Sequence, residues 1–227
     1  MIEKLLCFGL GLVISISGCN KNNYKDKVFG SGTIEATEIN VSAKVVGRIS
    51  TLAIKEGDRV NKGQLIAKLD DLEQAEKDFN RIQSLYEEKV IPIEQYEKIK
   101  KVKENFVIYA PVSGTVITQV MEEGEVVTPG QPIVTIADLD NLWVKIYISE
   151  CNIGKIKLGS KANIIVDAFP REIFHGVVTY ISDRAEFIPK NIQTKEERVN
   201  QVFAVKIKFK NIDNKLKIGM PCDVYIE

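Results

Sequence analysis

The chain has 227 residues, and its 31 basic and 31 acidic side chains give a net charge of zero. Nucleic-acid-binding proteins usually carry a basic excess, so we expect no nucleic-acid partner. The single histidine, His175, and four cysteines without a CxxC pair argue against a zinc site, which needs three or four closely spaced ligands. No metal or other cofactor is therefore predicted.

Residues 1–18 have the pattern of a signal peptide, because the apolar run Leu5–Ile16 is too short to span a membrane. The following Ile16-Ser17-Gly18-Cys19 resembles the lipobox of bacterial lipoproteins. That resemblance implies cleavage before Cys19 and a diacylglycerol on its sulfur, and two or more acyl chains anchor a protein stably. A signal peptide without a lipid is the alternative.

Residues 19–27 form the lipidated cysteine and a polar spacer without apolar periodicity. Its last eight residues reach at most roughly 28 Å when extended, so the folded part is expected close to a membrane surface. Asn20 is not the Asp that suggests inner-membrane retention in some bacteria, so the choice of membrane stays open, with the inner membrane favoured.

An internal repeat relates residues 43–71 to residues 110–138 at an offset of 67. Matched glycines bound short apolar stretches in both copies, and they are typical of tight turns that need a positive φ. The matched glycine pairs are Gly47 with Gly114, Gly57 with Gly124 and Gly63 with Gly130. Each copy therefore predicts a set of short strands.

Each copy resembles one half of a biotinyl or lipoyl carrier domain, through Ala-Pro-x-x-Gly at 110–114 and Glu-Gly-x-x-Val-x-x-Gly-Gln at 123–131. In such carriers a modified lysine sits on the turn joining the halves. Here 36 residues of helical character separate Leu69 from Phe106, and Lys68 has the setting of a solvated strand residue. A carrier subunit with covalent biotin or lipoate is a minor alternative, which a streptavidin blot would test.

Residues 72–105 are predicted to form a helical hairpin. Apolar residues recur at three and four positions in each predicted helix, 72–89 and 93–104, so the two stripes can seal against each other. Asp70 and Asp71 are suited to cap the first helix, and Pro92 marks the reversal. The stripes consist of Leu72, Ala75, Phe79, Ile82, Leu85 or Tyr86, and of Ile93, Tyr96, Ile99, Val102 and Phe106.

From Asn141 onwards, short strands with Gly and Asn turns predict a small antiparallel barrel over residues 141–227. The early residues Val28–Val41 are expected to join this barrel or the carrier-like domain. The expected fold is mainly β with an α-helical hairpin. Its parts are the strands and first lipoyl-like half at 28–71, the hairpin at 72–105, the second half at 106–140 and the barrel.

This order resembles the hemolysin-D-like membrane fusion proteins, which are periplasmic adaptors of efflux and secretion systems. The resemblance implies a non-catalytic protein that links an inner-membrane transporter to an exit channel and assembles into a ring, most often a hexamer. Residues 185–198 look most like adaptors of ABC exporters, whose permease and ATPase would then be the partner. The family's membrane-proximal domain is expected to be absent or minimal.

The resemblance also implies a channel-docking site at the hairpin tip, where the family carries an arginine, a leucine four residues later and a serine seven further on. Arg81 and Leu85 match, but Pro92, preceded by Ile91, stands at the serine position. That departure puts a polar tip contact in doubt. The first helix would span only about 27 Å, so an outer-membrane channel is allowed rather than required.

No motif typical of catalysis is present in the sequence, such as GxSxG, a Walker loop or HExxH, so no enzymatic activity is predicted. We expect the protein on the periplasmic side of the cell envelope, anchored by its lipid. The main alternative is a stand-alone envelope lipoprotein that binds a ligand or an envelope component without an exporter. The exported substrate, the oligomer number and the redox state of Cys151 and Cys222 stay open.

Overall fold

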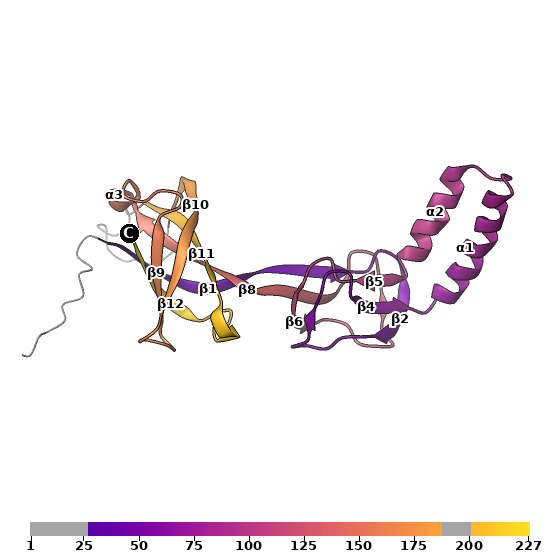
Figure 1. Ribbon diagram of the computed structural model, residues 1–227, viewed down its shortest axis with the longest axis horizontal. Coiled ribbons are helices and arrows are strands. Elements are labelled where there is room, and N and C mark those ends of the chain that lie inside the picture. The colour runs from indigo at the N-terminus through magenta and orange to yellow at the C-terminus, as the bar shows by residue number, and fades with distance from the viewer. Residues whose placement is uncertain (1–26, 188–200) are drawn as a thin grey trace, which may run out of the picture.

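The computed structural model describes residues 27–187 and 201–227. Figure 1 shows three parts in a row along the longest axis: a β-barrel at one end, a β-sandwich in the middle and a helical hairpin at the other end. The predicted fold class, mainly β with one helical hairpin, is confirmed. In the described part of the chain, no helix is long and apolar enough to cross a membrane.

The central sandwich is built from the two repeat copies. Its buried core comes from both, with Ile49 and Ile66 of the first copy and Ile133 and Ile136 of the second fully buried. The first copy supplies β2 (Gly47–Leu52), β3 (Arg59–Val60) and β4 (Leu65–Leu69), and the second supplies β5 (Val107–Tyr109), β6 (Gly114–Gln119) and β7 (Val126–Val127).

The two copies are interlocked by reciprocal contacts. Gly57 N donates to Val116 O at 2.8 Å, and at the equivalent place in the other copy Gly124 N donates to Ile49 O at 2.8 Å. All four turn glycines at 57, 63, 124 and 130 have φ between 84° and 94°, as the repeat predicted. Each half therefore completes the other half's turns, so neither half has its full set of hydrogen bonds alone.

Two long strands join the sandwich to the barrel. β1 (Val28–Ser42) and β8 (Pro132–Ser149) pair with each other from Gly32–Ile146 to Ser42–Pro132. β8 runs without a break from the apolar stretch Ile133–Ile136 of the second repeat copy into the apolar stretch Leu142–Ile148 of the barrel. No glycine or proline interrupts the segment between them, and β1 pairs with β8 on both sides of the joint, with a register shift between the pairs Glu35–Trp143 and Thr37–Asp138.

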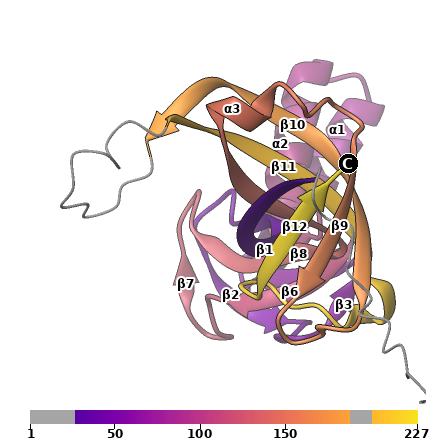
Figure 2. The ribbon, with the colours of Figure 1, turned by 90° about the vertical axis from the view of Figure 1, so that its left-hand side faces the viewer.

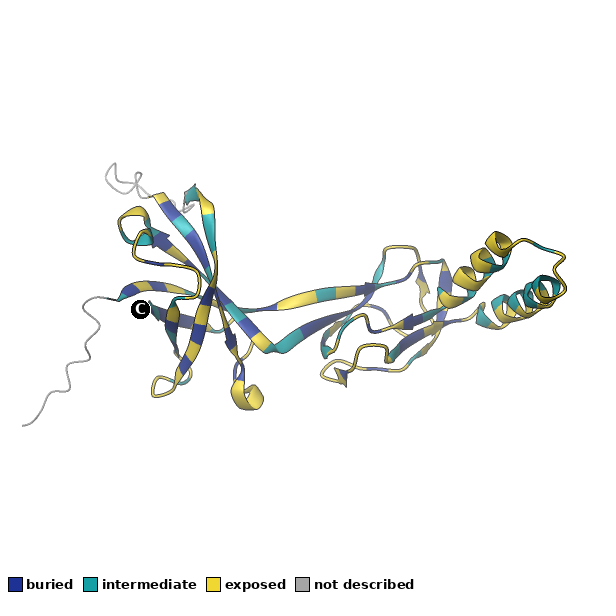
Figure 3. Ribbon diagram, turned by 45° about the horizontal axis from the view of Figure 1, so that its top comes forward, coloured by how far each residue is buried: buried dark blue, intermediate teal, exposed yellow. Residues whose placement is uncertain are grey.

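The barrel closes because β8 pairs with β1 at one side and with β11 at the other, in the order β1-β12-β9-β10-β11-β8. Its strands alternate between buried and exposed residues, which gives the banding in Figure 3. The remaining elements are α3 (Glu150–Ile153), β9 (Lys161–Val166), β10 (Ile173–Phe187), β11 (Gln201–Lys210), a 3-10 helix η2 (Ile212–Asn214) and β12 (Pro221–Ile226).

The hairpin consists of α1 (Leu72–Glu87) and α2 (Ile93–Glu104). Asp71 is the N-cap residue of α1, one of the two positions that the sequence predicted, but its side chain makes no capping hydrogen bond. The neighbouring Asp70 carboxylate instead accepts a hydrogen bond from Arg48 N at 3.0 Å. The carboxylate that could have capped the helix thus ties β2 to the hairpin base.

Candidate functional site: the hairpin tip and the domain joint

The four predicted docking residues lie at different levels of the hairpin. Arg81 is exposed in α1 and lies seven residues before the C-cap residue Glu88. Along the helix axis this is about 10 Å from the end of α1. Its guanidinium is paired within its own helix to Asp78, at 3.2 Å. Leu85 and Ile91 are half-buried, whereas Pro92 is exposed and forms the N-cap of α2.

The apex itself is the turn after α1. Lys89 has φ 60°, its N–H donates to Tyr86 O, and Val90 N donates to Leu85 O, both at 2.9 Å. This is the Schellman arrangement, in which glycine is the usual residue at the position of Lys89. Val90 is 64% exposed there. The sequence interpretation missed Lys89 and Val90 as the apex, because without a glycine no local signal marks the turn.

The seam between α1 and α2 is aromatic. Tyr96 stacks on Tyr86 with ring centroids 4.8 Å apart and meets Phe79 at 5.7 Å, and the Lys103 ammonium lies 4.6 Å from the Phe79 centroid. The predicted stripes do meet, but no residue of α1 or α2 is fully buried and Ile93 and Val102 stay exposed. The hairpin alone therefore buries little apolar surface.

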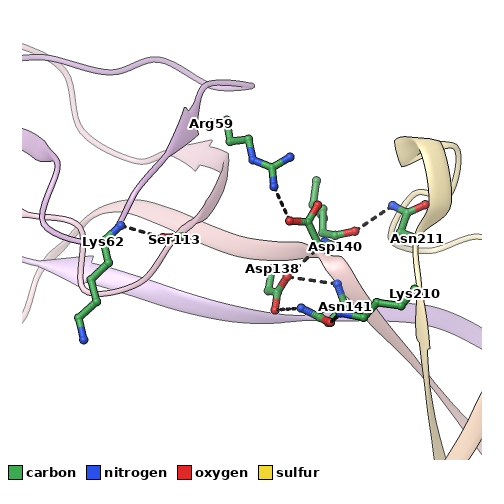
Figure 4. Close-up of polar contacts among 9 residues, drawn as sticks. Arg59, Lys62, Ser113, Asp138, Asp140, Asn141, Lys210 and Asn211 are labelled. Atoms are coloured by element: carbon green, nitrogen blue, oxygen red, sulfur yellow. Dashed lines mark hydrogen bonds and ion pairs between the residues drawn. The ribbon is translucent and has the colours of Figure 1, made fainter.

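The joint between sandwich and barrel is polar. Figure 4 shows Arg59 reaching from β3 to form an ion pair with Asp140 of β8. From the barrel side, Asn211 N donates to Asp140 O at 3.1 Å, and the Asn211 side chain donates to Leu139 O at 2.9 Å. Asn211 is buried, and its Oδ1 also accepts from Leu216 N at 3.0 Å. Residues 139 and 140 of β8 are thus held from both sides.

Other chemistry-bearing residues do not converge. In residues 27–187 and 201–227, no group of three or more His, Cys, Asp or Glu side chains could hold a metal ion. Lys68 is exposed on β4, and His175 on β10 contacts Asn163 Oδ1 at 3.0 Å. Cys19 and most of the 185–198 segment lie outside the described residues.

Both cysteines of the barrel that the structure describes are free thiols. Cys151 is exposed in α3. Cys222 is buried in β12, and burial raises the pKa of its thiol to about 12, with smaller contributions from Asp223 and Asp167. Because the thiolate is the reactive form, Cys222 is protected from alkylation at neutral pH.

Two family models match adjacent parts of the chain. Residues 37–139 match the barrel-sandwich hybrid domain of RND membrane fusion proteins, and residues 142–226 match a YknX-like beta-barrel domain. Together they cover the sandwich, the hairpin and nearly all of the barrel.

Curated relatives of the chain are named UPF0194 membrane proteins. One from Acidithiobacillus ferridurans is 42% identical over 120 residues, which cover 52% of this chain but only 35% of the relative. One from Yersinia pseudotuberculosis is 22% identical over 286 aligned positions, covering 85% of this chain and 87% of the relative. The chain thus spans about a third of the first relative and most of the second.

Solved structures share the fold of this chain. A MacA-MexA chimera with the Pseudomonas aeruginosa MexA hairpin is 24% identical, with TM-score 0.65, and covers 88% of this chain and 81% of its own. MacA from Actinobacillus actinomycetemcomitans is 22% identical, with TM-score 0.60 and coverages of 88% and 78%. The membrane fusion protein Spr0693 from Streptococcus pneumoniae R6 is 19% identical, with TM-score 0.58 and coverages of 88% and 98%.

A split sandwich with a helical hairpin at one end and a barrel at the other is the architecture of a family of elongated, non-catalytic adaptor proteins. The chain belongs to the membrane fusion proteins, the membrane-associated periplasmic adaptors of efflux systems. Proteins of this family partner inner-membrane transporters and outer-membrane channels.

Proposed function

We propose that this protein links an inner-membrane exporter of the ABC type to an exit channel, with a lipid on Cys19 holding it at the membrane. The observation that carries the proposal is the axial order of the parts. Figure 1 shows the hairpin at the end opposite to the start of β1, which directly follows the spacer. An anchor at one end and a free helical tip at the other are what a link between a membrane and a second protein requires.

The transporter class rests on a narrower basis. Residues 185–198 resemble adaptors of ABC exporters, whereas the matching sandwich model is described for RND systems. The transporter that co-purifies with the protein must therefore be identified directly.

Self-association into a ring, most simply of six copies, is part of the same proposal. The hairpin exposes Ile93 and Val102 and contains no fully buried residue, so neighbouring hairpins would supply the cover that each lacks. Ring contacts of this kind are head to tail and close by rotation. Crosslinking of intact cells followed by mass determination of the assembly gives the copy number.

The test of the link is photocrosslinking from the hairpin apex in living cells. A photoreactive residue replaces Val90 or Ile91 in the full chain, and crosslinked partners are identified by mass spectrometry. The matched control carries the same group at Lys62, an exposed turn residue of the sandwich. Recovery of a channel protein from the apex only, with an ABC transporter co-purifying, is the expected result.

A protein that purifies alone, with no apex crosslink, would instead support a stand-alone lipoprotein that binds a ligand or envelope component. A proton-driven transporter in the purified complex would keep the adaptor and refute the ABC assignment. If the channel crosslinks equally from Lys62, the hairpin apex is not the docking site.

A further inference from the structure

The end of the barrel from which β1 starts exposes several apolar side chains. Figure 2 looks onto this end, where β1 begins, β12 ends and α3 leads into β9. Three apolar side chains near it are exposed: Phe29 is 51% exposed, Leu158 68% and Val177 45%. Single exposed apolar residues are ordinary on soluble proteins, so their surroundings decide what they mean.

Leu158 is held in a fixed turn. Gly159, at φ 87°, donates its N–H to Val178 O at 2.9 Å, and Val178 N donates to Ser160 O at 3.0 Å. Ile156, two residues before Leu158, is buried beneath the turn. The turn is therefore bound to β10, and Leu158 is displayed on it rather than left on a loose segment.

The segment that carries Leu158 is basic, although one exposed acidic residue, Glu227, lies beside Lys161, to whose carbonyl oxygen its N–H donates at 2.9 Å. Residues 154–161 contain Lys155, Lys157 and Lys161 and no acidic residue. Val177 pairs directly with Lys161 across β10 and β9, which places an apolar side chain and an ammonium side by side. Phe29 packs against Tyr225 with ring centroids 5.2 Å apart, so it adds an aromatic surface on the neighbouring strands.

Aliphatic, aromatic and lysine side chains together form the composition that binds the interface between water and lipid. Lysine side chains near an anionic membrane surface are attracted to it electrostatically. The chain also enters the barrel here, because Lys27 precedes β1 and lies eight residues after Cys19. That stretch spans at most roughly 28 Å, so a lipid on Cys19 would keep this end near the headgroups.

We propose that this end surface, formed by Phe29, Leu158, Val177, Lys155, Lys157 and Lys161, lies directly against anionic lipid headgroups. The inference rests on the proposed lipid anchor at Cys19 and goes beyond it. The anchor only tethers the chain. Contact through this surface would also orient the molecule, with its long axis pointing away from the membrane and the hairpin at the far end.

The test measures how close this surface comes to lipid in the full, lipidated chain. Cys151→Ser removes the exposed thiol, and the buried Cys222 stays unlabelled. A bimane label is then placed at Leu158→Cys or, in the matched control, at Ile212→Cys. Ile212 is 65% exposed and belongs to η2, near the joint at the other end of the barrel. The proteins are reconstituted into phosphatidylethanolamine–phosphatidylglycerol vesicles that contain a headgroup nitroxide lipid.

We expect loss of fluorescence at position 158 and none at position 212. Replacing phosphatidylglycerol by phosphatidylcholine should weaken the quenching at 158, since the lysines lose their anionic partner. A protein that floats with the vesicles but is not quenched at 158 keeps the anchor and overturns this inference, and a protein partner would then cover the surface. Equal quenching at both positions also overturns it. A protein that does not float at all overturns the anchor and the inference together.

Discussion

The sandwich is connected to its neighbours at two equivalent places, one leading to the barrel (the barrel exit) and one leading to the hairpin (the hairpin exit). The two connections differ in how firmly they are held. By the repeat, β4 and β5 at one exit correspond to the sandwich portions of β8 and β1 at the other. At the barrel exit the strands continue as one paired ribbon into a buried core. At the hairpin exit they stop at Leu69 and Val107, and two helices without a buried residue follow.

This difference shows that one scaffold can supply both a fixed and a loosely supported connection. The barrel exit is fixed by the β1–β8 ladder on both sides of the joint, by Asn211 and by the Arg59–Asp140 pair. The exposed ion pair adds little alone, so the ladder and Asn211 dominate. The hairpin exit depends on Leu69 N donating to Phe106 O at 2.9 Å and on the Arg48–Asp70 contacts. We expect the barrel and sandwich to unfold as the stable unit, with the hairpin opening separately.

The largest loss of stability should come from a substitution in the β1–β8 strand pair. Ile146 of β8 is fully buried in the barrel core, so Ile146→Ala leaves a cavity and should lower the free energy of unfolding by about 2–5 kcal/mol. Urea unfolding followed by circular dichroism measures it. The exposed Ile212→Ala is the control and should change stability by less than about 0.5 kcal/mol. Equal losses from both variants would contradict a rigid barrel exit.

A smaller loss is expected at the joint. Asn211→Ala removes the hydrogen-bond partner of Leu139 O, Leu216 O and Leu216 N in a buried setting. The cost should be about 2–3 kcal/mol by the same urea measurement. Asn141→Ala, at an exposed position of the same joint, should stay within about 0.5 kcal/mol. If the two variants behave alike, Asn211 does not secure the joint.

In the hairpin the effect should be local. Tyr96→Ala removes both ring contacts of the seam, each worth about 0.5–1.5 kcal/mol. Hydrogen exchange should therefore quicken in α1 and α2 and stay unchanged in the barrel. Tyr109→Ala, an exposed tyrosine of β5, serves as control and should leave α1 and α2 protected. Faster exchange throughout the molecule would show that hairpin and barrel unfold together.

The smallest effect is a gain. Lys89→Gly removes the strain of a left-handed, non-glycine residue and should stabilise the hairpin by about 0.5–1 kcal/mol. Slower hydrogen exchange in the last turn of α1 is the measurement. Lys98→Gly, in the middle of α2, should instead cost about 1 kcal/mol. A loss at position 89 would mean that the lysine side chain stabilises the turn.

The sequence predicted what depends on local pattern. The glycines at 57, 63, 124 and 130 required tight turns with positive φ, and the apolar periodicity located the two helices. It could not predict the continuity of β8, because two apolar stretches joined by polar residues resemble two strands equally well. The sequence also could not predict the left-handed conformation of Lys89. The end of the preceding helix imposes that conformation, and a lysine gives no local signal for it.

The site was harder to predict than the fold. Arg59 and Asp140 are 81 residues apart, and no local sequence pattern around either residue indicates that they form a pair. Asp71 matched a helix-capping pattern, but its side chain makes no capping hydrogen bond. The neighbouring Asp70 carboxylate accepts a hydrogen bond from Arg48 N of β2 instead. The docking roles of Arg81, Leu85, Ile91 and Pro92 and the lipidation of Cys19 stay predictions, because they depend on molecules outside this chain.

The chain enters the hairpin from β4 and returns from it to β5, so both connections lie at the base of the hairpin. Lengthening each helix by the same number of turns would therefore disturb no strand register. Seven added residues per helix would move the apex outward by about 10 Å. The distance bridged by such a protein is thus adjustable by matched insertions, and lineages facing envelopes of different depth could vary it without redesigning either end.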